Sequence, residues 1–382
     1  MRHAAWLLLA LTACGFSAPK GSGGDDDGGG DDVAWWDDAY GHRRRLAVTV
    51  GVVRPDKGYA GYTARLAPFD ATALTGVTGS CDDLRVVVQD GERWVERPRH
   101  LLGCGTTAAD LRFALPADIA DGATWRDAFV YYDRKIPPAP LPADEAAVYL
   151  WWDDATTNRA AAYTRGRMDP WQATGHRESM AWDAAREYRF DTGNDAQESM
   201  RRDVDERDVL VEAEWRHTGC YDVNMQSGVC ARVLIASGAG ATETADHYYC
   251  TSRGQHPSCS FDDQGIYDGD IVKSDNETIA LQGLDDPPPF VPNQWRKQAL
   301  AVFGAGPTHL RFWDADESWA ALATPPDEAA QARGEDTTNN LPMRGAAGVM
   351  MSQDIGRLRN LVIRRYVEPE PVALLLEEEQ AP

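Results

Sequence analysis

Short runs of alternating apolar and polar residues, separated by glycine, proline, aspartate or asparagine, recur along most of this 382-residue chain. In the run Asp208–Trp215 the apolar positions are Val209, Val211, Ala213 and Trp215, and the positions between them are Leu210, Glu212 and Glu214. Since successive side chains of a strand point to opposite faces, one face is apolar and the other mostly acidic. This alternation predicts a sandwich with one solvated face.

Two series of such runs predict an all-β fold of two antiparallel β-sandwich domains. The first series comprises Arg45–Val50, Tyr62–Leu66, Asp83–Val88, Arg93–Val95, Leu111–Leu115 and Ala128–Tyr132. The second comprises Val148–Trp152, Asp208–Trp215, Val229–Ile235, His247–Cys250, Thr278–Leu281, Trp295–Phe303, His309–Trp313, Gly348–Met351 and Leu361–Val367. The 13 tryptophans of the chain also favour strands over helices.

A proline-rich stretch, Ile136–Pro142, separates the two series and predicts an extended spacer. We therefore place one domain at 35–135, a linker at 136–145, a second domain at 146–370 and a tail at 371–382. Residues Gly15–Asp32 are rich in glycine, serine and aspartate, which predicts a flexible, lipidated tether at 14–34.

The N-terminus has a basic start and a short apolar run, the pattern of a secretory signal peptide at 1–13. The sequence Leu11-Thr12-Ala13-Cys14 resembles the lipobox of bacterial lipoproteins, and this resemblance implies that Cys14 becomes a lipidated N-terminus. The alternative is an ordinary signal peptide with a chance cysteine. The apolar run is shorter than the roughly 20 residues that span a bilayer. Gly15, in place of an aspartate, favours the outer membrane or cell surface.

The chain has 38 basic and 60 acidic residues, for a formal net charge of −22. A field of that sign repels phosphates, so nucleic acid is excluded as an expected partner. It also repels anionic headgroups, which leaves the acyl chains on Cys14 as the predicted contact with the membrane.

Seven cysteines are present, and assigning Cys14 to lipid leaves six that can pair. Six cysteines allow 15 connectivities. We predict that cysteines that are neighbours in the sequence form disulfides with each other: Cys81 with Cys104, Cys220 with Cys230 and Cys250 with Cys259. Asp90-Gly91, a hairpin turn signal, lies almost midway between Cys81 and Cys104 and supports the first of these pairs.

The first domain carries a set of residues and motifs: Trp35-Trp36, Tyr40, Cys81–Val88, Gln89–Gly91, Leu115-Pro116, Ile119, Gly122 and Val130–Asp133. With these residues it resembles the bacterial domain of unknown function 2341. Asp133 stands where members of that family commonly have glycine. The resemblance implies a secreted or surface protein, often with a concanavalin A-like domain following, and it brings no catalytic residues.

The second domain contains, in this order, Asp208–Glu214, Gly228–Arg232, Trp295, Gly345–Gly348 and Asn360–Arg364. The order of these elements resembles the concanavalin A-like jelly roll of lectins, laminin-G-like modules and some glucanases. It implies an architecture and leaves the activity open, because that fold serves many functions.

Catalysis by a jelly-roll glycoside hydrolase requires two carboxylates that flank a sugar bond. The candidates are Glu206, Asp208 and Glu212, which would share a face of one extended strand but depart from the usual Glu-x-Asp-x-Glu spacing. The alternative interpretation is a solvated acidic strand face. Motifs of serine hydrolases, zinc proteases and nucleotide-binding loops are absent from the sequence.

Sugar recognition on a β-sandwich uses aromatic faces beside carboxylates and amides, often with calcium. The aromatic candidates are Trp151, Trp152 and Trp313. Calcium, the one cofactor that the sequence allows for, would use the oxygen-rich loop with Asp262, Asp263, Asp268 and Asp270. For both sets the alternative is structural: core packing for the tryptophans and a solvated acidic loop for the aspartates.

The sequence thus predicts a lipid-anchored protein of the cell envelope that binds a polysaccharide or an envelope protein without catalysis. A jelly-roll glycoside hydrolase is the alternative. A structural envelope protein without a soluble ligand is the second alternative.

Overall fold

The computed structural model describes residues 34–72, 81–107, 109–136, 140, 144–168, 175–176, 179–193, 196–220, 226–235, 244–254, 269–273, 277–279, 293–316, 332–337, 344–352 and 354–381. The fold described below is that of Trp36–Pro382. The predicted signal peptide, Cys14 and nearly all of the predicted tether lie outside the described residues.

The described residues form strands and two short 3-10 helices, and none of their helices is long and apolar enough to cross a membrane. The elements are β1 Tyr40–Thr49, β2 Thr63–Phe69, β3 Arg85–Asp90, β4 Arg93–Arg97, β5 Arg99–Leu102, β6 Ala109–Ala114, β7 Thr124–Arg134, η1 Glu145–Val148, β8 Trp151–Asp153, η2 Ala160–Ala162, β9 Thr164–Met168, β10 Gly175–His176, β11 Ala181–Asp183, β12 Glu187–Asp191, β13 Ala196–Glu206, β14 Val209–Cys220, β15 Gln226–Ile235, β16 Thr244–Gly254, β17 Gly269–Lys273, β18 Glu277–Ile279, β19 Arg296–Phe303, β20 Thr308–Asp316, β21 Ala332–Asp336, β22 Gly345–Ser352, β23 Asp354–Arg365 and β24 Val372–Gln380.

Sheet A forms the first sandwich and has the strand order β4-β3-β7-β1-β24-β2-β6-β5. Its two edge strands, β4 and β5, are separated in the sequence by Pro98 alone, so the sheet curls back until its edges meet. The core that it encloses includes Leu46, Val86, Leu111 and Val130, which are at most 1% exposed. The alternating runs of the first sequence series supply this core.

The β3–β4 hairpin turns through Gly91 and Glu92, with Asp90 paired to Arg93. Gly91 has a φ of 61°, a left-handed conformation that glycine adopts without strain. The predicted disulfide between Cys81 and Cys104 is confirmed, with Cα atoms 5.9 Å apart.

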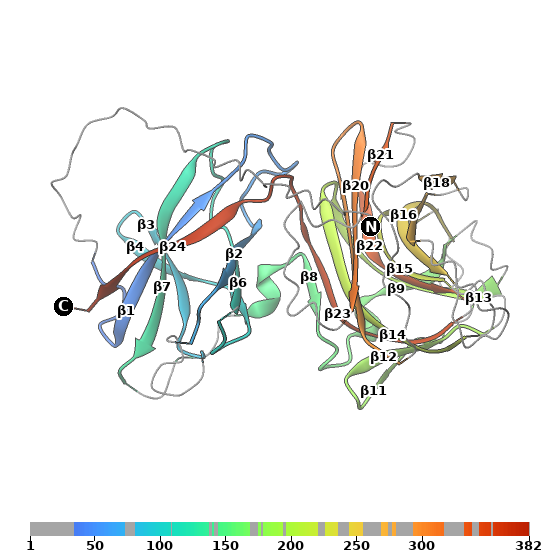
Figure 1. Ribbon diagram of the computed structural model, residues 1–382, viewed down its shortest axis with the longest axis horizontal. Coiled ribbons are helices and arrows are strands. Elements are labelled where there is room, and N and C mark those ends of the chain that lie inside the picture. The colour runs from blue at the N-terminus through green and yellow to red at the C-terminus, as the bar shows by residue number, and fades with distance from the viewer. Residues whose placement is uncertain are drawn as a thin grey trace, which may run out of the picture. The chain divides into compact units, whose positions relative to one another are not determined.

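The C-terminal segment differs from the expectation of a tail at 371–382. Residues Val372–Gln380 form β24, which pairs antiparallel with β1 and parallel with β2. Figure 1 shows this strand in red between β1 and β2. Ala373 is fully buried in the core of the first sandwich, whereas its neighbours Val372 and Leu374 are 52% and 53% exposed.

The second sandwich is a jelly roll of two sheets that pack face to face (Figure 1). Sheet B has the order β11-β12-β23-β14-β19-β20-β21 with β8 beside β23, and sheet C has the order β10-β13-β22-β15-β16-β17-β18 with β9 beside β13 and β16. Their shared core includes Trp215, Leu300 and Ile363 from sheet B and Val229 and Val349 from sheet C. The predicted all-β fold of two sandwiches is confirmed.

The outer face of sheet B is covered, which corrects the expectation of a solvated face. Val209, Val211, Ala213 and Trp215 lie in the core as the alternation predicts. Glu212 and Glu214, on the opposite face of β14, are only 1% and 6% exposed. Glu212 lies 3.8 Å from Arg112 of the first sandwich, so residues of sheet A help to cover this face.

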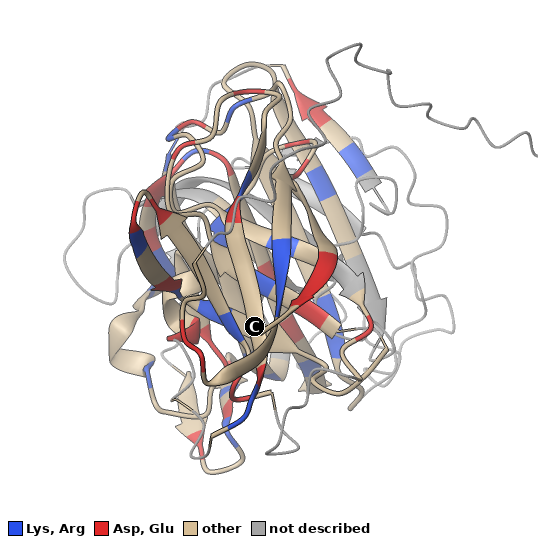
Figure 2. Cartoon of the chain, turned by 90° about the vertical axis from the view of Figure 1, so that its left-hand side faces the viewer, with Lys and Arg blue, Asp and Glu red and all other residues tan. Residues whose placement is uncertain are grey.

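Charged residues of both signs are interleaved along the strands in Figure 2. Arg43 on β1 pairs with Glu379 on β24 at 2.6 Å, and Arg85 on β3 pairs with Glu96 on β4 at 2.9 Å. The guanidinium groups of Arg43 and Arg85 are therefore engaged by carboxylates of neighbouring strands.

Candidate functional site

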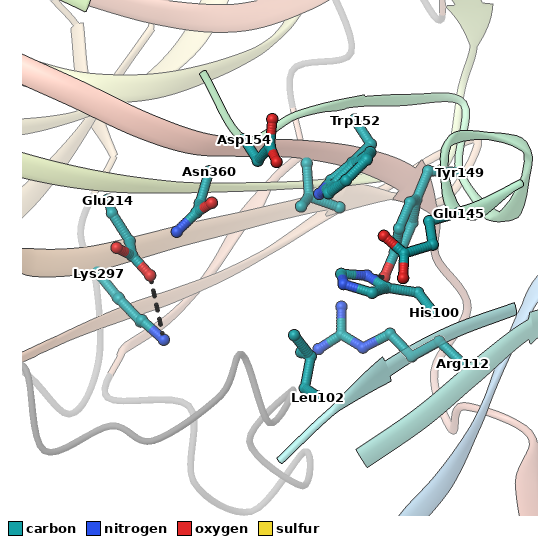
Figure 3. Close-up of a pocket in the computed structure, with 11 residues that line it drawn as sticks. His100, Leu102, Arg112, Glu145, Tyr149, Trp152, Asp154, Glu214, Lys297 and Asn360 are labelled. Atoms are coloured by element: carbon teal, nitrogen blue, oxygen red, sulfur yellow. Dashed lines mark hydrogen bonds and ion pairs between the residues drawn. The ribbon is translucent and has the colours of Figure 1, made fainter. Parts of the chain in front are cut away.

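A pocket of about 370 Å³ opens where the first sandwich, η1 and the outer face of sheet B meet. This volume lies within the range of small-molecule sites. Figure 3 shows the side chains that line it. They are His100, Leu102 and Arg112 from the first sandwich, Glu145, Tyr149, Trp152 and Asp154 from the segment that contains η1 and β8, and Glu214, Lys297, Asn360 and Val362 from strands β14, β19 and β23 of sheet B.

Three rings form the aromatic wall of the pocket. Trp152 on β8 lies opposite Val362 of β23 in the strand register, and its ring is 5.2 Å from that of His100. The Nδ1 atom of His100 lies 2.7 Å from the hydroxyl oxygen of Tyr149, at hydrogen-bonding distance. These contacts fix the aromatic wall before a ligand arrives, which reduces the entropy lost on binding.

The opposite wall is polar and belongs to sheet B (Figure 3). Lys297 on β19 pairs with Glu214 on β14 at 3.3 Å, and Arg359 on β23 donates to Glu214 from Nε at 2.6 Å. The β14–β23 register shifts between Glu212 and Glu214, opposite Asn360. Asn360 has a φ of 51°, and this bulge places its amide in the wall of the pocket.

Burial and the nearby guanidinium of Arg112 lower the pKa of His100 from 6.5 to about 4. His100 is therefore neutral near pH 7. Burial also raises the pKa of Glu145, with Arg99 opposing and Asp154 reinforcing that rise. The effect of Asp154 indicates that the two carboxylates sense each other inside the pocket.

The low pKa of His100 makes the protein less stable in acid. In the unfolded chain the pKa is about 6.5, so folding favours the neutral ring, and this contribution is complete above pH 6.5 and is lost as pH falls towards 4. The His100→Asn variant keeps an amide that can bond Tyr149 but has no group that titrates at this position. When the pH falls from about 7 to 4, we expect the free energy of unfolding of the wild type to decrease by about 2–3 kcal/mol more than that of the variant. Urea unfolding at each pH measures the difference. Parallel pH profiles for the two proteins would contradict the expectation.

Of the three tryptophans selected from the sequence, the structure places only Trp152 in the pocket. Trp151 packs against the jelly-roll core, donates from Nε1 to the Tyr163 hydroxyl at 2.8 Å and carries the guanidinium of Arg202 4.1 Å from its ring centre. Trp313 is 1% exposed and packs on Tyr366. Trp313 is therefore a core residue that does not present its face to a ligand.

The carboxylates selected for glycoside hydrolysis do not form a cleft. β13 ends at Glu206 in sheet C and β14 begins at Val209 in sheet B, so Glu206, Asp208 and Glu212 do not lie on one strand. They are 4%, 6% and 1% exposed, which also corrects the alternative of a solvated face.

Each of these carboxylates is held by cations or backbone donors. Glu206 lies 3.0 Å from Arg365 and 3.3 Å from Lys57. Asp208 pairs with Arg207 and accepts from the backbone amide of Gly304.

The calcium candidates Asp262, Asp263 and Asp268 lie outside the described residues. Asp270 lies in the backbone of β17, but its side chain is also outside them. Within the described ranges, no group of three or more histidine, cysteine or acidic side chains could hold a metal ion.

Cys230 is disulfide-bonded, and in the β15–β16 register its position is opposite Cys250. The expected partners Cys220, Cys250 and Cys259 have no described side chains. The pairings Cys220–Cys230 and Cys250–Cys259 therefore stay predictions.

Sequence reasoning missed most of the pocket. His100, Glu145 and Asn360 come from regions far apart in the chain and carry no shared motif. The one available signal is the pair Trp151-Trp152, since adjacent residues of a strand point to opposite faces and only one of them can enter the core.

No protein-family model matches the chain, and no curated protein matches it. The resemblance to the domain of unknown function 2341 and the lipidation of Cys14 at the lipobox therefore stay predictions. Forty-two chains of solved structures match.

Three of these structures illustrate the range. A Bacillus subtilis protein of unknown function with a galectin-like fold is 8% identical, with a TM-score of 0.35 over 56% of this chain and 95% of that one. The exoplasmic/lumenal domain of VIP36 in its Ca²⁺-bound form is 6% identical, with a TM-score of 0.35 over 59% and 95%. The GH43 protein BlXynB from Bacillus licheniformis is 11% identical, with a TM-score of 0.32 over 74% and 53%. Similarity this low assigns neither a family nor an activity.

Proposed function

We propose that this protein is a noncatalytic carbohydrate-binding protein of the cell envelope, with its sugar site in the pocket around Trp152. The observation that carries the proposal is the composition of that pocket. One wall is aromatic, and the other offers carboxylate, ammonium and amide groups within a volume of about 370 Å³.

A sugar ring presents apolar C–H groups on its faces and hydroxyl groups around its edge. An aromatic ring such as that of Trp152 offers an apolar face with little conformational entropy to lose. Carboxylates accept hydrogen bonds from hydroxyl groups, as Glu145 and Asp154 can do here, and an amide such as that of Asn360 can both accept and donate them. This combination of stacking surface and polar rim supports a sugar more than a purely apolar ligand.

A glycan array probed with the full-length protein tests the proposal. We expect Trp152→Ala to weaken binding by on the order of tenfold or more, because a central aromatic contact carries much of the affinity of such sites. Trp94→Ala is the matched control, since Trp94 is a partly buried tryptophan on β4 that packs on Phe129 and Tyr131 and does not line the pocket.

Equal losses in the two variants would assign the effect to folding rather than to the site. No binding to any glycan by the folded wild-type protein would contradict the proposal and favour a structural role or an envelope-protein partner. Repeating the array with a calcium chelator tests the separate hypothesis that Asp262, Asp263, Asp268 and Asp270 bind calcium.

We further infer that lipid on Cys14 anchors the protein to the outer membrane or cell surface. The support is the sequence Leu11-Thr12-Ala13-Cys14 after an apolar run. Cells fed an alkyne-tagged palmitate should label the wild type and leave Cys14→Ser unlabelled. Fractionation should place the labelled protein in the outer membrane. Labelling of Cys14→Ser, or recovery of the wild type from the inner membrane, would contradict the respective part of this inference.

A further inference from the structure

Two carboxylates of the pocket form no ion pair with any cation that the structure describes. The carboxylate of Glu145 accepts no hydrogen bond from a described residue, and the cation that it senses, Arg99, is not in the lining of the pocket. Asp154 accepts from the backbone amide and the hydroxyl of Thr156, both through Oδ1, at 2.9 and 2.8 Å. These are neutral donors, so the charge of Asp154 also stays uncompensated. The two carboxylates repel each other, as the rise that Asp154 causes in the pKa of Glu145 indicates.

The cations that line the pocket are already engaged elsewhere. Lys297 pairs with Glu214 at 3.3 Å. Arg112 lies 3.2 Å from Asp110 and 3.8 Å from Glu212, which are both buried. His100 is neutral near pH 7, since its pKa is about 4. The pocket therefore carries an excess of negative charge at the end where Glu145 and Asp154 lie.

One nitrogen of Arg112 lacks a hydrogen-bond acceptor and requires the opposite chemistry. Arg112 is 1% exposed, and its Nη1 atom lies 3.8 Å from Glu212 but donates no hydrogen bond to any described residue. Figure 3 shows the guanidinium pointing towards the ring of His100, inside the pocket. A buried donor without a partner costs free energy, and a ligand oxygen placed there would recover it.

The ligand that meets both requirements has an ammonium group and a hydroxyl oxygen on a compact ring. We propose that the pocket selects an amino sugar with a free amino group, its ammonium bound by Glu145 and Asp154 and one ring hydroxyl accepting from Arg112. The ring then stacks on Trp152. N-acetylation removes the charge that the carboxylates require, and a uronic acid brings a charge that they repel. This inference rests on the proposed carbohydrate-binding function.

The test is a titration of the full-length protein by calorimetry with three tetrasaccharides. These are the glucosamine tetramer, its fully N-acetylated counterpart and a galacturonic acid tetramer. We expect the glucosamine tetramer to bind on the order of tenfold more tightly than the acetylated one, because hydrogen bonds to charged groups are worth more than neutral ones. We expect added salt to weaken that preference, and the galacturonic acid tetramer to bind most weakly.

The variant that isolates the charge is Glu145→Gln with Asp154→Asn, which keeps the shape of both side chains. It should bind the glucosamine tetramer no more tightly than the acetylated one. Glu92→Gln with Asp127→Asn is the matched control, since both residues are exposed on the first sandwich and outside the pocket. The control should keep the preference of the wild type.

Three outcomes would overturn the inference. Equal or tighter binding of the acetylated tetramer would refute the amino-group preference and leave carbohydrate binding intact. Failure of all three sugars, with the protein folded, would refute the proposed function as well. Tighter binding of a tetralysine peptide than of the glucosamine tetramer would show that the pocket recognises an amine on a polypeptide instead of on a sugar.

Discussion

Replacing Ala373 with aspartate in β24 should lower the free energy of unfolding by about 3 kcal/mol or more. Ala373 is fully buried, lies opposite Val48 of β1 and Leu66 of β2, and belongs to the core of the first sandwich. A carboxylate at that position loses its hydration and finds no cation among the aliphatic side chains around it. The midpoint of urea unfolding, followed by tryptophan fluorescence, measures the loss.

Leu374→Asp is the matched control on the same strand. Leu374 is 53% exposed, so its aspartate stays hydrated and should cost no more than about 1 kcal/mol. If 371–382 were a tail, both substitutions would be tolerated alike. Equal and small shifts of the unfolding midpoint would therefore contradict the assignment of β24 to sheet A.

Replacing Arg364 with methionine should cost about 3–5 kcal/mol of unfolding free energy. Arg364 is 3% exposed, and its guanidinium bonds to Glu370 and lies 3.2 Å from Glu212. Burial opposes the charge of Arg364, but the carboxylates of Glu370 and Glu212 outweigh it and hold its pKa well above the ordinary value. Removing the cation leaves these carboxylates without the partner that compensates their lost hydration.

Arg126→Met, at an exposed position of β7, is the control and should leave the urea midpoint within about 0.5 kcal/mol of the wild type. Adding Glu212→Gln and Glu370→Gln to Arg364→Met should restore part of the loss, because it removes the uncompensated charges. A midpoint for Arg364→Met that equals that of Arg126→Met would show that this buried network contributes nothing to stability.

The inner layer of the jelly roll could be predicted from the alternation in β14, since the positions of Val211 and Trp215 follow from the two-residue period of a strand. The burial of the opposite face could not be predicted in this way. Glu212 and Glu214 have the polarity of a solvated face, but what covers them comes from distant parts of the chain, including Arg112, Lys297 and Arg364. The two-residue period of a strand predicts which residues share a face of the sheet. Which other residues cover that face depends on the tertiary structure.

Dependence on distant parts of the chain is also the reason why neither the strand within 371–382 nor the pocket could be predicted from the sequence. The apolar run of β24 is short, and the strands with which it pairs are near the other end of the sequence, so no local pattern identifies it as a central strand. Trp152 could be selected because aromatic residues suit sugars. His100 and Asn360 could not, since their roles depend on a sheet edge and a bulge that bring them to one place.

The position of β24 also has a consequence for the order in which the molecule folds. Arg43 of β1 and Glu379 of β24 form an ion pair across 336 residues of sequence, and every strand of the jelly roll lies between them. In the sequence, the jelly roll is thus inserted between the first seven strands of the first sandwich and its last strand, β24. Because synthesis proceeds from the N-terminus, the nested domain is complete before its host receives its central strand. The sandwich that comes first in the sequence is therefore the last to close.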